Sequence, residues 1–236
     1  MARGMLTEQT PILLSIALLL AAYLLGAVPV GLLIVRWRTG KDLRSEHSGR
    51  TGGTNAMRAA GWTAGVLTGF GDLAKGALAV VLARELSGGN EWLAAGAGLM
   101  AILGHNYSVF LVERDNGGLR FRGGAGGAPT VGATLAIWPI AGLAGLGIGL
   151  GVLFGTGYAA LGTLAAGLSA AVMLTWRAVA AGGSWADAFF GIGALILLVI
   201  ALLPNMRRLL AGSERAISLR RTKAQPGKSM GPGSAG

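Results

Sequence analysis

Six long apolar runs divide this chain, and they restrict its fold more than any other feature. The runs cover residues 11–35, 61–83, 92–112, 127–155, 158–176 and 185–203. Each approaches or exceeds the ~20 residues that a helix needs to cross the hydrocarbon core of a bilayer. The chain is 53% hydrophobic and only 13% charged, so a soluble domain of this composition would expose large apolar patches. The sequence therefore predicts an all-α, polytopic integral membrane protein.

Glycine, cysteine and histidine usage narrows the possibilities further. Glycine accounts for 42 of the 236 residues, and small residues let membrane helices approach closely, so we expect a compact bundle. The chain has no cysteine and two histidines, which excludes disulfides and thiol chemistry and disfavours a zinc site. We therefore expect neither a metal nor a cofactor. The first apolar run is too long for a signal peptide, so it is expected to be the first span.

The distribution of positive charge predicts the orientation in the membrane. The net charge is +10, and the basic residues gather in the loop 36–60 and after the last apolar run. Positive loops mark the cytoplasmic side and suit anionic lipid, whereas six spans would put these two regions on opposite sides. Pro139 interrupts the fourth run, because proline breaks the helical hydrogen-bond ladder. Two short helices, 127–137 and 140–155, would give seven spans and a cytoplasmic C-terminus.

The same topology predicts the domain organisation and one site. We expect a single transmembrane domain over residues 1–220 and a disordered cytoplasmic tail over residues 221–236, which lack apolar periodicity. The loops 36–60, 113–126 and 204–220 would all face the cytoplasm. They hold most of the polar groups, and no basic face with interleaved aromatics suggests nucleic acid. The sequence therefore predicts that the cytoplasmic loops form one site.

Two polar stretches lie in the first half of the chain. "HSGRTGGTNAMR" (47–58) combines hydroxyl, amide and glycine N–H donors with a final arginine that can hold a phosphate by two parallel hydrogen bonds. A solvated loop that ends at a helix cap, with Thr54 or Asn55 as the cap, explains the same residues. Asp72 and Lys75 share one face of an apolar helix, where they indicate either a functional pair or a structural ion pair.

Three more polar stretches follow in the second half. "GHNYSVF" (104–110) places His105 near the end of a span, where it fits a base, a substrate ligand or a packing residue. "FRGGAGGAPT" (121–130) opens a helix, and bare amides and the helix dipole converge at such a turn. Arg122 beside these glycines is therefore the best phosphate-binding candidate. "NMRRLLAGSE" (205–214) is typical of an interfacial helix.

Taken in order, these stretches resemble the motifs of the bacterial acyl-phosphate:glycerol-3-phosphate acyltransferases, the PlsY family. "SGRTGGTNAMR" (48–58) is similar to the family's S-G-N-P-G-A-T-N-x-x-R, and "DLAKG" (72–76) matches its D-x-x-K-G. "GHNYSVF" and "FRGGAG" resemble G-H-x-x-P-x-F and F-K-G-G-K-G. Residues 202–214 resemble H-x-x-N-I-x-R-L-x-x-G-x-E. The resemblance covers most of the chain outside its two ends.

The resemblance implies a seven-span enzyme of the bacterial inner membrane, with its site and C-terminus cytoplasmic. Such an enzyme moves a fatty acyl group from acyl phosphate to the 1-hydroxyl of sn-glycerol 3-phosphate, and releases lysophosphatidate and phosphate without a metal or cofactor. We expect a monomer in the lipid bilayer that binds no nucleic acid. The resemblance implies catalytic roles for Ser48, Arg58 and His105. It implies phosphate binding by Gly49, Arg50, Gly52, Thr54, Asn55, Lys75, Arg122, Gly123, Gly124, Gly126, Asn205, Arg208 and Glu214.

Several positions depart from the family pattern. Arg50 and Thr51 stand where the first motif has Asn and Pro, and Ser108 stands where a later motif has Pro. Leu202 stands where the last motif has His. Ala125 replaces the second lysine of K-G-G-K-G, and residues 112–120 enlarge the loop before it. We hypothesise that Arg50 supplies the positive charge that Ala125 lacks. Two alternatives stay open, a catalytically inactive paralogue and a small-solute transporter or channel, although the polar residues gather at one side rather than along the spans.

Overall fold

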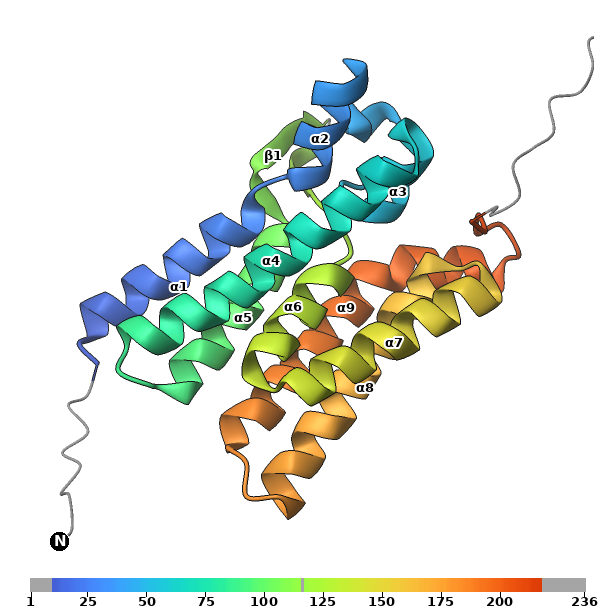
Figure 1. The fold of residues 1–236 in the computed structure, drawn as a ribbon. Helices are drawn as coiled ribbons and strands as arrows, with labels where there is room; N and C mark the ends of the chain where they lie inside the picture. Colours follow the sequence, from blue (N-terminus) through green and yellow to red (C-terminus); the bar gives the residue numbers. More distant parts are fainter. Residues whose placement is uncertain (1–9, 116, 218–236) are drawn as a thin grey trace, which may run out of the picture.

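Apolar helices make up most of residues 10–115 and 117–217, the part of the chain that the computed structural model describes (Figure 1). In chain order the elements are α1 (Ile12–Ala27), α2 (Val30–Thr39), η1 (Leu43–Ser45), α3 (Gly53–Ala60), α4 (Trp62–Leu86), α5 (Glu91–Asn106), β1 (Ser108–Asp115), β2 (Gly118–Arg122), α6 (Gly127–Ile137), α7 (Pro139–Thr156), α8 (Ala159–Ala180) and α9 (Trp185–Leu210). The segments long and apolar enough to cross a membrane are Ile12–Thr39, Trp62–Leu86, Pro139–Thr156, Ala159–Ala180 and Trp185–Leu210. The predicted all-α membrane fold is confirmed. The expected tail, residues 221–236, lies outside the described residues.

The fourth apolar run divides where the sequence predicts. Helix α6 ends at Ile137, Trp138 adopts an extended conformation, and α7 begins at Pro139. Proline is favoured at the first helical position, because its missing N–H would have no partner there in any case. Helix α6 has 11 residues and is short for a crossing, whereas α7 has 18 and is longer than expected.

The helices differ from the predicted runs at three places. The first run forms one candidate span, Ile12–Thr39, but its helix is interrupted at Val28 and Pro29 before α2 begins. The third run ends as a helix at Asn106, and the residues after it enter a β-strand. The last run continues through Pro204 to the end of α9, so "NMRRLLAGSE" contains no separate interfacial helix. Just beyond the proline, the side chain of Asn205 is held by Arg50 and Glu214.

The enlarged loop folds as a β-hairpin, which the sequence analysis missed. Strand β1 pairs antiparallel with β2, with Val112 opposite Phe121, and the register is irregular between Ser108 and Val112. The Ser108 hydroxyl donates a 2.6 Å hydrogen bond to the carbonyl of Ala27, which fastens the start of β1 to the end of α1. Figure 1 shows the hairpin beside α2, at the end of the bundle that also holds α3 and the C-terminal end of α9.

Glycines bring the central helices into close contact. Helix α1 packs against α5, and α4 packs against α6. A Cβ on Gly26 would overlap the backbone of Ala101, and a Cβ on Gly76 would overlap the backbone of Pro129. The glycine excess therefore serves the tight packing that the composition predicts. These crossings bring polar residues of α4 and α5 to one end of the bundle, beside the start of α6.

Candidate active site

A cavity of ≈ 660 Å³ lies between α3, α4, α6, α7 and α8. The polar and charged residues that line it are Ser48, Arg50, Thr54, Asn55, Arg58, Asp72, His105, Thr163, Asn205, Glu214 and Arg215. Apolar side chains of α4 and α7 and small residues of α6 and α8 line the remainder. Trp62 of α4 and Phe154 of α7 stack with their ring centroids 6.3 Å apart. One cavity therefore joins a polar end to an apolar slot.

The buried side chain of Asn55 organises the loop between α2 and α3. Its amide nitrogen lies within hydrogen-bonding distance of the carbonyls of Leu43, Glu46 and Arg50, at 3.2, 3.0 and 2.8 Å. Its side-chain oxygen accepts a 3.4 Å hydrogen bond from the backbone N–H of Ser48. Because both the nitrogen and the oxygen of this amide contact the surrounding loop, Asn55 holds the loop in shape at the cavity wall. None of these contacts supports direct phosphate binding by Asn55.

Helix α3 begins without a side-chain cap. Gly52 is its N-cap residue, so the expectation that Thr54 or Asn55 caps the helix is wrong. The glycine leaves the helix N-terminus uncovered by a side chain of its own, and the first N–H groups of a helix attract anions. Ser48 and Thr54 line the cavity on either side of this turn. The first loop therefore offers hydroxyls and a helix start to the polar end.

Arg50 joins three separate segments at the polar end. One terminal nitrogen donates a 2.9 Å hydrogen bond to the carbonyl of Gly124. The other donates to the carbonyl of Ala201 at 2.6 Å and to Oδ1 of Asn205 at 3.0 Å. Burial lowers the pKa of Arg50, and the nearby Arg208 lowers it further. Its two terminal nitrogens both donate to protein acceptors, so the guanidinium is held in place beside Ala125 rather than free to swing toward a substrate.

Asp72, Lys75 and His105 form a buried polar cluster between α4 and α5. The Lys75 ammonium lies 2.9 Å from Asp72 Oδ1 and donates to the carbonyl of Val28 at 2.9 Å. His105 Nδ1 lies 3.5 Å from the same carboxylate oxygen. Asp72 and His105 line the cavity, whereas Lys75 does not. The pair is therefore a structural ion pair whose carboxylate also lies beside the cavity histidine, and a functional role for it stays a prediction.

The glycine-rich turn before α6 lies directly against His105. The Gly124 N–H donates a 2.9 Å hydrogen bond to the His105 carbonyl, and Thr51 N–H donates to the carbonyl of Gly123 at 3.2 Å. A Cβ on Gly124 would overlap His105 Nε2. Gly126 caps α6 with a left-handed φ of 85°, and it lines the cavity together with the first residues of α6. The turn thus places a helix N-terminus and an imidazole at the same end of the cavity.

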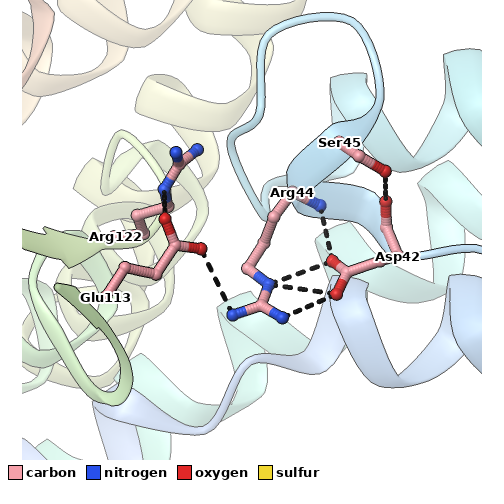
Figure 2. A network of polar contacts seen from close by, with 5 residues as sticks. All are labelled: Asp42, Arg44, Ser45, Glu113 and Arg122. Carbon is pink, nitrogen blue, oxygen red and sulfur yellow. Dashed lines mark hydrogen bonds and ion pairs between the residues drawn. The ribbon is translucent and has the colours of Figure 1, made fainter. Parts of the chain in front are cut away.

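Arg122 belongs to an ion-pair network outside the cavity wall (Figure 2). Its Nε lies 2.6 Å from Oε2 of Glu113, and Oε1 of Glu113 lies 3.3 Å from Arg44. Arg44 in turn pairs with Asp42 at 2.6 Å, and this guanidinium lowers the pKa of Asp42 to about 2. The network joins strands β1 and β2 to the loop after α2. The best phosphate candidate of the sequence is therefore held beside the cavity by the hairpin.

The segment after α9 returns to the polar end of the cavity. Glu214 accepts a 2.8 Å hydrogen bond from Asn205 on one oxygen and another of 2.8 Å from Arg208 on the other. Arg58 donates a 3.1 Å hydrogen bond to the carbonyl of Arg215. Burial lowers the pKa of Arg58, and Glu214 partly offsets that effect. Contacts within the last motif therefore hold the segment after α9 at the polar end of the cavity, where it also contacts the half-buried Arg58.

The structure brings most of the predicted site residues together. Those that line the cavity are Ser48, Arg50, Gly52, Thr54, Asn55, Arg58, His105, Gly126, Asn205 and Glu214. Those that do not line it are Gly49, Lys75, Arg122, Gly123, Gly124 and Arg208. The second group lies one contact away, in the ion pairs and turns described above. The functional roles of both groups stay predictions.

Sequence reasoning missed the apolar wall and one acidic residue. Trp62, Val66 and Phe70 line the cavity from one face of α4, and their spacing of four residues was a readable signal. Ile217 lines it from the chain segment after α9, which no periodicity marks. Glu113 also carried no signal, because one arginine partner, Arg122, is brought to it by the hairpin and the other, Arg44, comes from the loop after α2.

Comparison with known proteins identifies relatives over nearly the whole chain. The family model described as glycerol-3-phosphate acyltransferase matches residues 16–212. A glycerol-3-phosphate acyltransferase of Thermus thermophilus is 40% identical over 203 residues, covering 86% of this chain and 94% of that protein. One from Symbiobacterium thermophilum is 36% identical, covering 91% and 98%.

Solved structures give the same result at the level of the fold. A crystal structure of PlsY (YgiH), an integral membrane glycerol 3-phosphate acyltransferase in its glycerol 3-phosphate form, is 33% identical with a TM-score of 0.75. The superposition covers 86% of this chain and 96% of the solved chain. The lysophosphatidic acid form of PlsY superposes with a TM-score of 0.72 at 31% identity, covering 86% and 94%. The chain belongs to the glycerol-3-phosphate acyltransferase family.

Proposed function

We propose that this protein is a membrane enzyme that transfers a fatty acyl group from acyl phosphate to the 1-hydroxyl of glycerol 3-phosphate. The products are lysophosphatidate and inorganic phosphate. Membership in the family supports glycerol 3-phosphate as the acceptor, and the solved relatives are glycerol 3-phosphate and lysophosphatidic acid forms of PlsY. The acyl phosphate donor is the one that the resemblance of the five motifs implies.

The two-part cavity is the observation that carries the proposal. Its polar end contains arginines, hydroxyls and a helix N-terminus, which suit phosphate groups. Its apolar part is flanked by Trp62, Val66 and Phe70 of α4, all more than half exposed on the outer surface of the bundle. A fatty acyl chain could therefore lie in the slot while its headgroup stays at the polar end. A transporter needs no such joining of one polar end to a lateral apolar slot.

The chemistry needs positioning and one proton transfer. Acyl phosphate is a mixed anhydride and already activated, so the enzyme need not supply a nucleophile. The acceptor hydroxyl oxygen forms a bond to the acyl carbon, and the bond between that carbon and the phosphate oxygen breaks. His105 Nε2 or the departing phosphate takes the hydroxyl proton. Ser48 and Arg58 at the polar end are suited to bind phosphate and neutralise developing charge.

We further propose that the site faces the cytoplasm of a bacterial inner membrane. Arg36 and Arg38 lie in the last turn of α2, and Arg207 and Arg208 lie in the last turn of α9. Figure 1 shows the C-terminal ends of these two helices at the same end of the bundle. Positive residues at a membrane surface favour the cytoplasmic side. We also propose a monomer, because this chain itself supplies both the polar end and the apolar slot of the cavity.

The test is direct turnover by the purified protein in lipid nanodiscs. Hexadecanoyl phosphate and glycerol 3-phosphate are supplied, phosphate release is followed, and lysophosphatidate is measured by mass spectrometry. Equal amounts of the two products are expected, and hexadecanoyl coenzyme A should give none. Phosphate without lysophosphatidate would indicate a hydrolase and contradict the proposal. No reaction, together with glycerol 3-phosphate flux into proteoliposomes, would favour the transporter.

Replacing Arg58 with alanine is expected to lower kcat/KM by about 10- to 100-fold, because a charge-assisted hydrogen bond to an anion contributes about 1.5–3 kcal/mol. The Arg58 guanidinium reaches the polar end and makes one hydrogen bond to the Arg215 carbonyl. Arg38→Ala, at an exposed position of α2, is the matched control and should keep normal turnover. Unchanged kcat/KM in Arg58→Ala would remove this arginine from the substrate site.

A further inference from the structure

The hairpin holds Arg122 by one nitrogen and leaves its other two turned away. Glu113 of β1 contacts Nε of Arg122 at 2.6 Å, while its second oxygen lies 3.3 Å from Arg44. Figure 2 shows the two terminal nitrogens of Arg122 pointing away from Glu113. The contact between Nε and Glu113 is an ion pair, and within residues 10–115 and 117–217 the Arg122 side chain makes no hydrogen bond. The side chains of Glu113 and Arg122 are 32% and 29% exposed, so the pair is held at a partly covered surface.

The free end of Arg122 lies beside the first polar loop. Its Nη1 is 3.1 Å from the position that a Cβ would occupy on Gly49. Gly49 stands between Ser48 and Arg50, both of which line the polar end of the cavity. Any side chain at position 49 would meet this guanidinium and would also be strained, because φ is 67° there. The glycine therefore keeps open the space between Arg122 and the cavity.

The chemistry of the guanidinium explains why an acidic neighbour is tolerable here. A guanidinium presents Nε and two terminal nitrogens in one plane, so it can pair with a carboxylate on one edge and a phosphate on another. A lysine has a single side-chain nitrogen, which would have to contact both the carboxylate and the phosphate. The motif that this turn resembles has lysine where Arg122 stands, whereas this chain combines arginine with a hairpin that supplies Glu113.

We propose that Glu113 is a positioning residue that holds Arg122 through Nε, so that its terminal nitrogens meet a substrate phosphate beside Gly49. This inference rests on the proposed function, because it requires a phosphate-bearing substrate at the polar end. The hairpin thereby contributes to the site without lining it. Arg44, fixed by Asp42, holds the second oxygen of Glu113 and completes the support.

A charge-removing substitution distinguishes positioning from simple proximity. If Glu113 were only a negative charge near the phosphate, Glu113→Gln would tighten phosphate binding by removing repulsion. If Glu113 positions Arg122, the same change should raise the Kd of glycerol 3-phosphate about tenfold, because the guanidinium loses its fixed direction. Its KM should rise in parallel, with kcat changed less. Glu46→Gln is the matched control, since Glu46 pairs with Lys41 at 3.4 Å in the same loop region.

A double-mutant cycle with Arg122→Lys tests the same idea from the other side. The lysine nitrogen should be drawn to Glu113, so Arg122→Lys alone should weaken binding about tenfold or more. In Glu113→Gln/Arg122→Lys the lysine is released toward the phosphate, and binding should recover beyond that of either single variant. Glu113→Gln would then weaken binding in the wild type and strengthen it in Arg122→Lys. Independent sites do not show such a reversal, because their effects on the binding free energy add.

Isothermal titration with glycerol 3-phosphate and with inorganic phosphate measures these affinities without turnover. Tighter or unchanged binding in Glu113→Gln, or a double variant no better than Arg122→Lys, would overturn the positioning role. An inactive wild type that still shows the predicted cycle in phosphate binding would contradict the proposed function alone. Thermal melting of each variant in nanodiscs confirms that the bundle is intact.

Discussion

Arg50→Asn is expected to reduce acyl transfer by about 100-fold or more and to lower the melting temperature, because each buried polar group left unpaired costs ~1–3 kcal/mol. The arginine donates to Gly124, Ala201 and Asn205, and so ties the first loop to the glycine turn and to α9. Asparagine is too short to reach these acceptors. Initial rates and thermal melting in nanodiscs measure the two effects together.

A second substitution separates the charge of Arg50 from its hydrogen bonds. Ala125→Lys restores a cation to the glycine turn, as the charge-compensation hypothesis requires. We expect little effect from Ala125→Lys alone and no recovery in Arg50→Asn/Ala125→Lys, because a lysine at position 125 cannot link three segments. A double variant with near wild-type activity would show instead that the charge is what matters. Arg38→Asn on the exposed face of α2 controls for loss of a positive residue.

Gly124→Ala should strongly reduce transfer through the volume of one methyl group. The new Cβ would overlap His105 Nε2, and Gly124 also donates a hydrogen bond to the His105 carbonyl. The imidazole is only 5% exposed and lies against Asp72, so it has little room to move away. Overpacking in a closely packed interior typically costs about 1–3 kcal/mol. If this energy is lost from the catalytic geometry, the rate falls roughly 5- to 100-fold. With the imidazole displaced, we expect the loss to lie at the upper end.

The matched control for this prediction is Gly117→Ala in the hairpin, where a Cβ would meet open space. Gly124 does not have a positive φ, so alanine there introduces volume without backbone strain. Rates should fall in Gly124→Ala and stay normal in Gly117→Ala, at similar melting temperatures. An active, stable Gly124→Ala would mean that His105 can shift freely, and it would weaken the case for His105 as the proton acceptor.

Helix boundaries were predictable where one residue dominates the local energetics. Pro139 ends one helix and starts the next, because it lacks an N–H and its ring excludes the preceding turn. Pro204 has the same chemistry, yet α9 continues past it. The difference is that Asn205, next in the chain, is held by Arg50 and Glu214. Local rules therefore failed where contacts with distant segments carried more weight.

The sequence by itself determined the membrane class, the helix-rich fold and the clustering of polar residues at one end. Hydrophobic length and charge distribution are additive properties of the chain, so they can be read without knowing any contact. The tertiary structure alone decided which polar groups face the cavity and which serve other residues. Asn55 holds its own loop, and Arg122 is held by Glu113. Such pairings depend on distances of a few ångströms between residues far apart in the chain, and those distances are set only when the helices pack and the hairpin forms.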